Sequence, residues 1–246
     1  MYKIFATFYS LTICFLLAPV VFYSSCDLPL KAEKKELNAE EVMTASLDAV
    51  GSPAARESIH SIICLAECSS PQGSYSTEMH TDSSGYSYFK QTYSYKPDSF
   101  EAIVQHKTAG WSTGPPRQFL SPEAIAVIRG HEFLNLVLQT DQRFSGFEQP
   151  LLVARKNGEY LQVNARNETG DTCTLFFDPV THLFRELHFQ NPGQPGEIIQ
   201  TRFSDWRKVN DLQLPHHVEI IQAGKNYRFD FIKISLNDPG FRQKII

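Results

Sequence analysis

Three side chains near the middle of the chain have types and a spacing that could support chemistry. His182, Glu186 and His188 are separated by even numbers of residues, so within a strand their side chains would lie on the same side. Two imidazoles and a carboxylate on one side could bind a metal ion or carry out acid–base catalysis. The polar pattern around them is more typical of a solvated strand face, so an enzyme that uses this cluster is the less favoured hypothesis.

Other motifs give little support to catalysis or metal binding. The sequence contains no Gly-x-Ser-x-Gly nucleophile motif and no glycine-rich phosphate loop. Cys64 and Cys68 fall in one expected strand, where their side chains would be ~13 Å apart, too far for a disulfide. No second Cys or His pair stands at zinc-ligand spacing. We expect no catalytic residue, metal or cofactor; a disulfide to Cys173 stays open.

The composition excludes several classes of protein. The chain has 246 residues, of which 42% are hydrophobic and 20% charged, which excludes a disordered chain and a polytopic membrane protein. The net charge of -4 is unfavourable for neutralising phosphates, so we expect no nucleic-acid partner. Aromatic residues make up 12% of the chain, which favours strands over helices.

The N-terminal segment predicts export. Lys3 precedes an uncharged, largely apolar stretch from Ile4 to Tyr23, which is typical of a signal peptide. Small residues then precede Cys26, as in a bacterial lipoprotein attachment site, although Tyr23 stands where an aliphatic residue is usual. Lipid attachment at Cys26 and cleavage without lipid both remain open. We divide the chain into a signal peptide at 1–26, a polar tether at 27–37 and one domain at 38–246.

The domain is predicted to be mainly β with some helix, an α+β fold. Asn38 and Gly51 have the residue types of a helix start and end, and Ser52-Pro53 and Ser121-Pro122 begin further helices. Most of the remaining chain alternates apolar and polar residues in about ten or eleven segments, separated by turns such as Asn157-Gly158. A sheet of that size curls, so we predict an incomplete antiparallel β-barrel with helices plugging its concave side.

One side of this sheet is apolar along most of its strands, and the helix after Ser121 contributes apolar residues of its own. Such residues either fill a core or line a cavity that admits an apolar ligand, and the pattern leaves both interpretations open. The candidates for the lining of a ligand cavity are Leu161, Val163, Leu175, Phe177, Leu187, Phe189, Phe203, Val218, Ile220, Phe229, Phe231, Ile125, Ile128 and Phe133.

Three stretches resemble the outer-membrane lipoprotein-sorting family, the LolA/LolB-like carriers and receptors whose fold RseB-type periplasmic sensors share. Residues 39–62 resemble its opening helices and first strand, residues 203–220 a hairpin that resumes at Leu214-Pro215, and residues 229–241 its closing strand. The turn before Leu214 commonly has Asp-Gly; here Asn210-Asp211 leaves Asn to adopt a positive φ. No position matches the family's lid-contacting arginine, so no specific site residue is transferred.

The resemblance implies a helical lid over an apolar cavity that binds acyl chains of lipoproteins or another amphiphile. It implies a protein that is not an enzyme, in the periplasm or anchored to a membrane of the bacterial cell envelope. Its expected partners are the lipid cargo, a bacterial membrane and a membrane protein that takes over the cargo, and the chain is expected to be a monomer. The alternative within the same fold is an RseB-type sensor or adaptor that binds a protein partner.

Labelling with a fatty-acid probe in cells separates the two outcomes at Cys26. If lipid is attached there, the wild-type chain takes up the probe and Cys26→Ser does not. Cleavage without lipid leaves both chains unlabelled, which would contradict a lipid anchor.

Overall fold

The computed structural model describes residues 38–113, 117–191, 194 and 196–243. These residues belong to one unit of the chain, Glu36–Ile246. The predicted signal peptide at 1–26, with Cys26, and the predicted tether at 27–37 lie outside the described residues. In the part of the chain that is described, no helix combines the length and the apolar character needed to cross a membrane.

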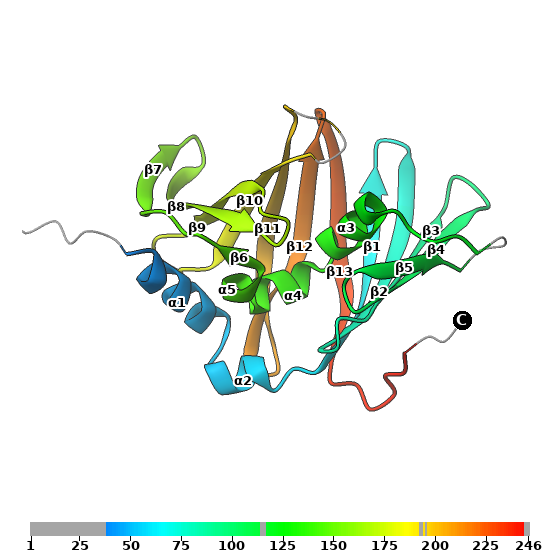
Figure 1. Cartoon of the computed structure of the whole chain (residues 1–246). Helices are drawn as coiled ribbons and strands as arrows, with labels where there is room; N and C mark the ends of the chain where they lie inside the picture. Colours follow the sequence, from blue (N-terminus) through cyan, green and yellow to red (C-terminus); the bar gives the residue numbers. More distant parts are fainter. Residues whose placement is uncertain (1–37, 114–116, 192–193, 195, 244–246) are drawn as a thin grey trace, which may run out of the picture. The chain divides into compact units, whose positions relative to one another are not determined.

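The described residues form one sheet of thirteen antiparallel strands (Figure 1). The strands are β1 (Ser61–Ser70), β2 (Gly73–Asp82), β3 (Ser87–Tyr93), β4 (Ser99–Gln105), β5 (Ala109–Ser112), β6 (Phe144–Ser145), β7 (Leu151–Arg155), β8 (Gly158–Asn167), β9 (Thr172–Phe177), β10 (Phe184–Gln190), β11 (Ile198–Val209), β12 (Leu212–Gln222) and β13 (Lys225–Leu236). Their order is β5-β4-β3-β2-β1-β13-β12-β11-β10-β9-β8-β6, with β7 also paired to β8. The order is open, so the sheet does not close, and the predicted incomplete barrel is confirmed.

Two strands go beyond the ten or eleven that the sequence predicts. They are β5, with four residues, and β6, with two. Segments this short cannot show an alternating pattern, and their pairing depends on the neighbours β4 and β8.

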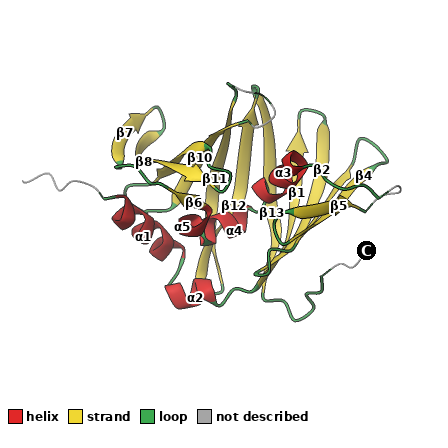
Figure 2. Cartoon of the chain, in the orientation of Figure 1, coloured by secondary structure: helices red, strands yellow, loops and turns green. Residues whose placement is uncertain are grey.

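Within the same described residues, five short helices lie on one side of the sheet or at its edge (Figure 2). They are α1 (Ala39–Val50), α2 (Pro53–Glu57), α3 (Pro122–Gly130), α4 (Phe133–Leu138) and α5 (Thr140–Arg143). The predicted helix starts are confirmed: Asn38 Oδ1 accepts a hydrogen bond from the Glu40 amide at 3.0 Å, and Ser52 and Ser121 cap α2 and α3 in the same way. α1 and α4 contact each other, and both contact β12. We call α3–α5, residues 122–143, the helical insertion because they separate β5 from β6.

The core lies between these helices and the sheet, and aromatic rings make up much of it. The ring of Phe133, on α4, lies 5.3 Å from the ring of Phe229 and 6.3 Å from that of Phe203. Phe184 stacks between Phe177 and Phe203, with 5.1 Å between ring centroids on each side. All five rings are almost fully buried, so the insertion and the strands share one apolar interior.

Two asparagines adopt a positive φ directly after a strand. Asn210 has φ 55° in the β11–β12 turn, which confirms the conformation expected where glycine is absent. Asn237, at φ 52°, follows β13 and accepts hydrogen bonds from the backbone amides of His60 and Ser61 at 2.7 and 3.2 Å. It therefore ties the end of the last strand to the start of the first.

We predict that Gly51→Ala destabilises the fold although its backbone conformation suits any residue. A Cβ at Gly51 would lie 2.5 Å from Leu212 Cδ2 and 3.1 Å from the Asp211 carbonyl oxygen, so α1 could no longer approach β12. We expect the free energy of unfolding to fall by about 1–3 kcal/mol. Urea unfolding measures the loss.

Gly130→Ala is the matched control, because nothing lies within 4 Å of a Cβ at that helical position. Alanine favours helix there, so stability should stay equal or rise by up to about 1 kcal/mol. Equal losses in both variants would contradict the steric explanation.

Candidate functional site

The apolar residues predicted to line a cavity gather where the helices meet the sheet. Most are buried members of a single core cluster: Leu161, Val163, Leu175, Phe177, Leu187, Phe203, Val218, Phe229, Phe231, Ile125, Ile128 and Phe133. Phe189 and Ile220 are half-buried and pack against that cluster. These side chains surround one interior, and its use by a ligand stays a prediction.

Helix and sheet side chains fill most of this interior. The cavity under the α3–α4 junction has a volume of about 10 Å³, which is room for about one water molecule. His131 lies at its wall, with its ring 5.1–5.6 Å from those of Phe89, Phe133 and Phe229. Burial lowers the pKa of His131. An acyl chain could enter this space only if the helical insertion moved away from the sheet.

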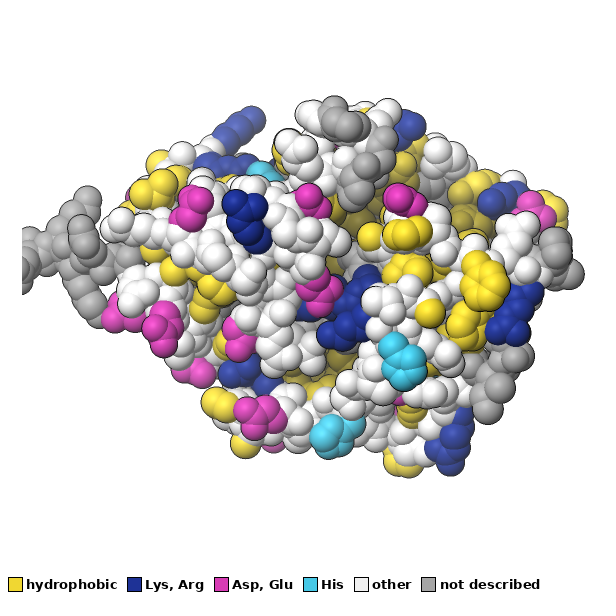
Figure 3. Space-filling model, viewed as in Figure 1, with side chains coloured by type: hydrophobic (Ala, Val, Ile, Leu, Met, Phe, Trp, Pro, Cys, Tyr) yellow, Lys and Arg dark blue, Asp and Glu magenta, His cyan; other side chains and the backbone are white. Residues whose placement is uncertain are grey.

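A network of four charged side chains holds the helical insertion in place. Glu132 accepts hydrogen bonds from Arg143 at 2.9 Å and from the Ser87 hydroxyl of β3 at 2.5 Å. Arg129 donates to Glu168, in the β8–β9 turn, at 2.7 Å, and Arg143 Nε lies 3.6 Å from the same carboxylate. Figure 3 shows basic and acidic side chains meeting beside α3 and α4, with hydrophobic atoms visible between them. We call these residues the insertion network.

The insertion network is largely buried, so each charged side chain needs its oppositely charged neighbours to compensate its charge. The side chains of Arg129, Glu132 and Arg143 are 4–11% exposed, whereas that of Glu168 is 36% exposed. Burial alone would raise the pKa of Glu168, but Arg143, Arg129 and Lys107 outweigh it and lower the pKa below its ordinary value. Buried ion pairs add little net stability, yet removing one partner leaves an uncompensated charge, so the network fixes the position of the insertion.

Sequence reasoning missed this network. Arg129 and Glu132 show the i,i+3 spacing of a helical ion pair, which was the one available signal. Glu168 is 39 residues from Arg129, in a polar turn whose pairing partner no local pattern indicates.

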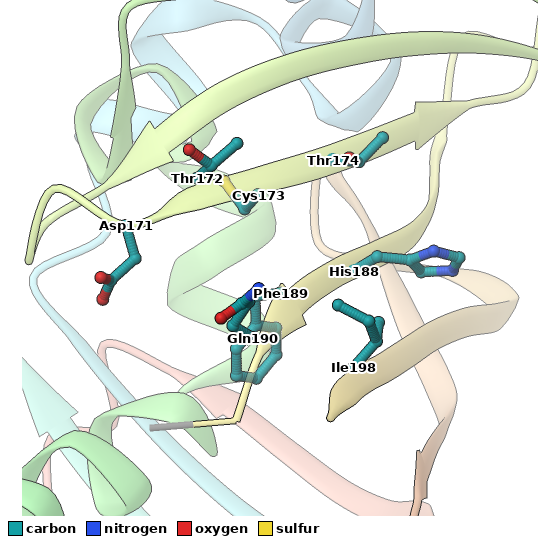
Figure 4. A pocket seen from close by; sticks show the side chains of 8 residues that line it. All are labelled: Asp171, Thr172, Cys173, Thr174, His188, Phe189, Gln190 and Ile198. Carbon is teal, nitrogen blue, oxygen red and sulfur yellow. The ribbon is translucent and has the colours of Figure 1, made fainter. Parts of the chain in front are cut away.

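The ladder between β9 and β10 stops one residue short of the ladders on either side. Their ladder ends at the pair of Cys173 with Phe189. On either side, the β10–β11 ladder continues to the pair of Gln190 with Ile198, and the β8–β9 ladder continues to Thr172. A hollow of about 500 Å³ lies at this gap, and Figure 4 shows the side chains around it. Phe189 lines this hollow and also packs against the core cluster.

The proposed chemical cluster of His182, Glu186 and His188 is not assembled as one group. His182 lies in the turn before β10, at φ 59°, with its amide bonded to the Asp178 carbonyl oxygen. His188 Nε2 does contact Glu186, at 3.0 Å. Among the described residues, no three His, Cys, Asp or Glu side chains lie close enough together to hold a metal ion. The prediction that these three side chains lie on one side of a strand was wrong for His182, because this residue lies before β10.

Glu186 is instead the centre of an ion cluster on the opposite side of the sheet from the core. It accepts a hydrogen bond from Arg155 at 2.7 Å and lies 3.4 Å from Arg202 Nε, and the Arg155 guanidinium also covers the ring of Phe176. Burial would raise the pKa of Glu186, but His188 and the two guanidiniums outweigh it and lower the pKa to about 2. A carboxylate held charged in this way is unsuited to accept a proton near neutral pH.

The cysteines of the described domain are buried and unpaired. Cys64, Cys68 and Cys173 are all free thiols, which answers the question of a disulfide to Cys173. Burial raises the pKa of each thiol to about 12. They therefore act as small apolar core residues and not as nucleophiles.

We predict that Glu132→Gln lowers the free energy of unfolding by about 2–4 kcal/mol, because it leaves Arg143 and Arg129 with too little opposing charge in a buried place. Thermal or urea unfolding measures the change. Asp141→Asn on exposed α5 is the control and should stay within about 0.5 kcal/mol of the wild type. A Glu132→Gln variant as stable as this control would show that the network is not needed.

We predict that Glu186 makes stability depend on pH in the acid range. Its pKa is lower in the folded state than the ordinary 4.5, so its contribution is complete above pH 4.5 and is lost as the pH falls towards 2. Glu186→Gln should unfold more readily at neutral pH and show a flatter decline of stability through that range. Urea midpoints measured across pH test this, and parallel curves for the two proteins would refute it.

Comparison with known proteins supports a fold assignment. No family model and no curated protein matches the sequence. Among solved structures, a LolA superfamily protein from Nitrosomonas europaea is 12% identical, with a TM-score of 0.57 and coverage of 82% of this chain and 94% of that one. An outer membrane lipoprotein-sorting protein domain from Vibrio parahaemolyticus is 11% identical, with a TM-score of 0.56 and coverage of 84% and 96%. A DUF1329 family protein from Desulfovibrio piger is 10% identical, with a TM-score of 0.52 and coverage of 82% and 94%.

Identities this low carry no residue roles from one chain to another, but three structures aligned over most of their length share the curled sheet and its helices. The resemblance drawn from residues 39–62, 203–220 and 229–241 is therefore confirmed at the level of architecture: this chain has a LolA-like fold.

Proposed function

We propose that this chain is a binding protein of the bacterial cell envelope that shields the acyl chains of a lipoprotein, or of another amphiphile, during transfer between membranes. The observation that carries the proposal is the helical insertion. It covers the apolar side of the curled sheet with residues such as Ile128 and Phe133, and it leaves and rejoins the sheet at the short strands β5 and β6. A cover made of one short segment can move without unfolding the sheet.

The energetics favour shielding over tight binding. Transfer of a chain from water to an apolar interior gains ~0.8 kcal/mol per methylene. A bilayer offers nearly the same gain, so a carrier cannot extract a lipid by hydrophobicity alone. Here the ligand must also replace existing contacts between the insertion and rings such as Phe203 and Phe229. The resulting moderate affinity suits a protein that hands its cargo on.

The envelope location rests on the N-terminal sequence together with the fold. The signal peptide at 1–26 would bring the chain across the inner membrane, and lipid at Cys26 would hold it at a membrane surface. Without that lipid the chain would move through the periplasm with its cargo. Catalysis is not part of this proposal, because Glu186, the carboxylate of the candidate cluster, is held charged by two arginines.

To test this proposal, the protein is purified from a bacterial host, and the lipids bound to it are extracted and identified by mass spectrometry. We expect acyl lipids in a stable ratio to protein and displacement of a fluorescent acyl probe by the extract. Protein that carries no lipid and binds no acyl probe would overturn the proposal. A tightly copurifying protein without lipid would favour a sensor or adaptor.

Adjacent isoleucines of β12 supply a matched pair of variants. Ile220 packs against the core cluster, whereas Ile221 points to the opposite side, in the row of Gln200 and Asn226. Both are half-buried. We expect Ile220→Glu to weaken binding of an acyl probe by tenfold or more, about 1.4 kcal/mol, and Ile221→Glu to leave it within about twofold. Equal effects of the two would argue against an apolar site on the core side.

A further inference from the structure

We propose that the hollow between β9 and β10 is the part of the binding site that receives the head group of the amphiphile, and that it selects an uncharged polar head over an anionic one. This inference rests on the proposed function. It adds a place in the fold and a chemical class of ligand, neither of which the LolA-like architecture supplies.

The hollow lies where two neighbouring hairpins stop pairing with each other. The β9–β10 ladder ends at Cys173 and Phe189, one residue before the outer ladders end at Thr172 and Gln190. Thr172 and Gln190 are therefore not paired with each other, and both line the hollow at this gap in the ladder. With a volume of about 500 Å³, this gap is in the size range of sites for small molecules.

The hollow has an apolar inner side and a polar outer side. Cys173 is buried and Phe189 packs against the core cluster, so this side of the hollow is apolar. Thr172 and Thr174 project from the other side of β9, as Figure 4 shows. Ile198, 44% exposed, lies at the outer edge. A molecule with a hydrocarbon tail and a polar head fits this gradient, with its tail directed to Phe189.

The charges at the hollow disfavour an anionic head group. The eight described residues that line it include one carboxylate, Asp171, and one imidazole, that of His188, which contacts Glu186 at 3.0 Å; none of them is lysine or arginine. The nearest guanidinium along β8, that of Arg166, donates to the Gly170 carbonyl oxygen at 3.0 Å. An anion would thus meet the Asp171 carboxylate and no lining lysine or arginine.

An uncharged hydroxyl or amide head group finds suitable partners in the same place. The hydroxyl of Thr172 and the side-chain amide of Gln190 offer both donors and acceptors. The Asp171 carboxylate accepts from the Thr169 hydroxyl at 2.6 Å and retains further capacity to accept from a ligand hydroxyl. A glyceryl or amide head matches these groups, whereas a phosphate or a free carboxylate does not.

The experiment compares two probes with the same chain and different heads, monopalmitoylglycerol and palmitate, in competition with an uncharged fluorescent acyl probe at mildly alkaline pH. For the wild-type chain we expect the monoglyceride to bind at least about fivefold more tightly. Asp171→Asn should raise the affinity for palmitate by about fivefold and leave the monoglyceride within about twofold.

Variants at two exposed isoleucines locate the site. Ile198→Asp should weaken both probes by about fivefold or more, because it places a charge at the edge of the hollow. Ile232→Asp is the control: Ile232 is 56% exposed on β13, away from the hollow, and its substitution should change neither affinity.

Each outcome decides a separate point. Binding of neither probe overturns the proposed function itself. If both probes bind and Ile198→Asp changes neither affinity, the hollow is not the binding site. That result does not affect the proposed function. Equal binding of palmitate and monoglyceride, unchanged by Asp171→Asn, overturns the selection of an uncharged head. The expected pattern in all three comparisons supports the inference.

Discussion

The contact of Phe133 with the rings of β11 and β13 joins the helical layer to the sheet. It attaches the helical insertion to the concave side of the sheet and excludes water from the apolar faces of both. An open curled sheet with one bare apolar face would be prone to aggregate, so some cover is required. The same close packing leaves a cavity of only about 10 Å³ under the α3–α4 junction. An acyl chain does not fit in that cavity while the insertion stays in place.

Two different kinds of force act on the insertion. The apolar contacts do not specify one arrangement closely, because rings can repack at modest cost. The insertion network is directional: Glu132 binds Ser87 and Arg143, while Glu168 binds Arg129. The apolar contacts hold the helical insertion on the sheet, and the ion pairs fix it in a single closed position. Without the ion pairs, only the less specific apolar contacts would hold it on the sheet.

Much of the architecture could be predicted from the sequence, because it depends on local rules. Asn38, Ser52 and Ser121 cap helices, and the alternation in segments such as Leu161 to Ala165 shows which face is buried. Features that depend on distant partners could not be predicted. Glu168 gives no local sign that it pairs with Arg129, and nothing in β9 or β10 alone indicates that their ladder stops at Cys173. His182 was grouped with Glu186 by spacing, but a turn removes it from the strand.

If the proposed function is right, an acyl chain occupies the interior between the sheet and the helical insertion. Photo-crosslinking with a fatty acyl chain that carries a diazirine near its end, followed by peptide mass spectrometry, shows where the chain lies. We expect crosslinks to core-facing residues, with Phe189, Phe203 and Phe229 among the first to be labelled. Crosslinks confined to the opposite side of the sheet, around residues such as Ile221 or Ile232, would contradict it.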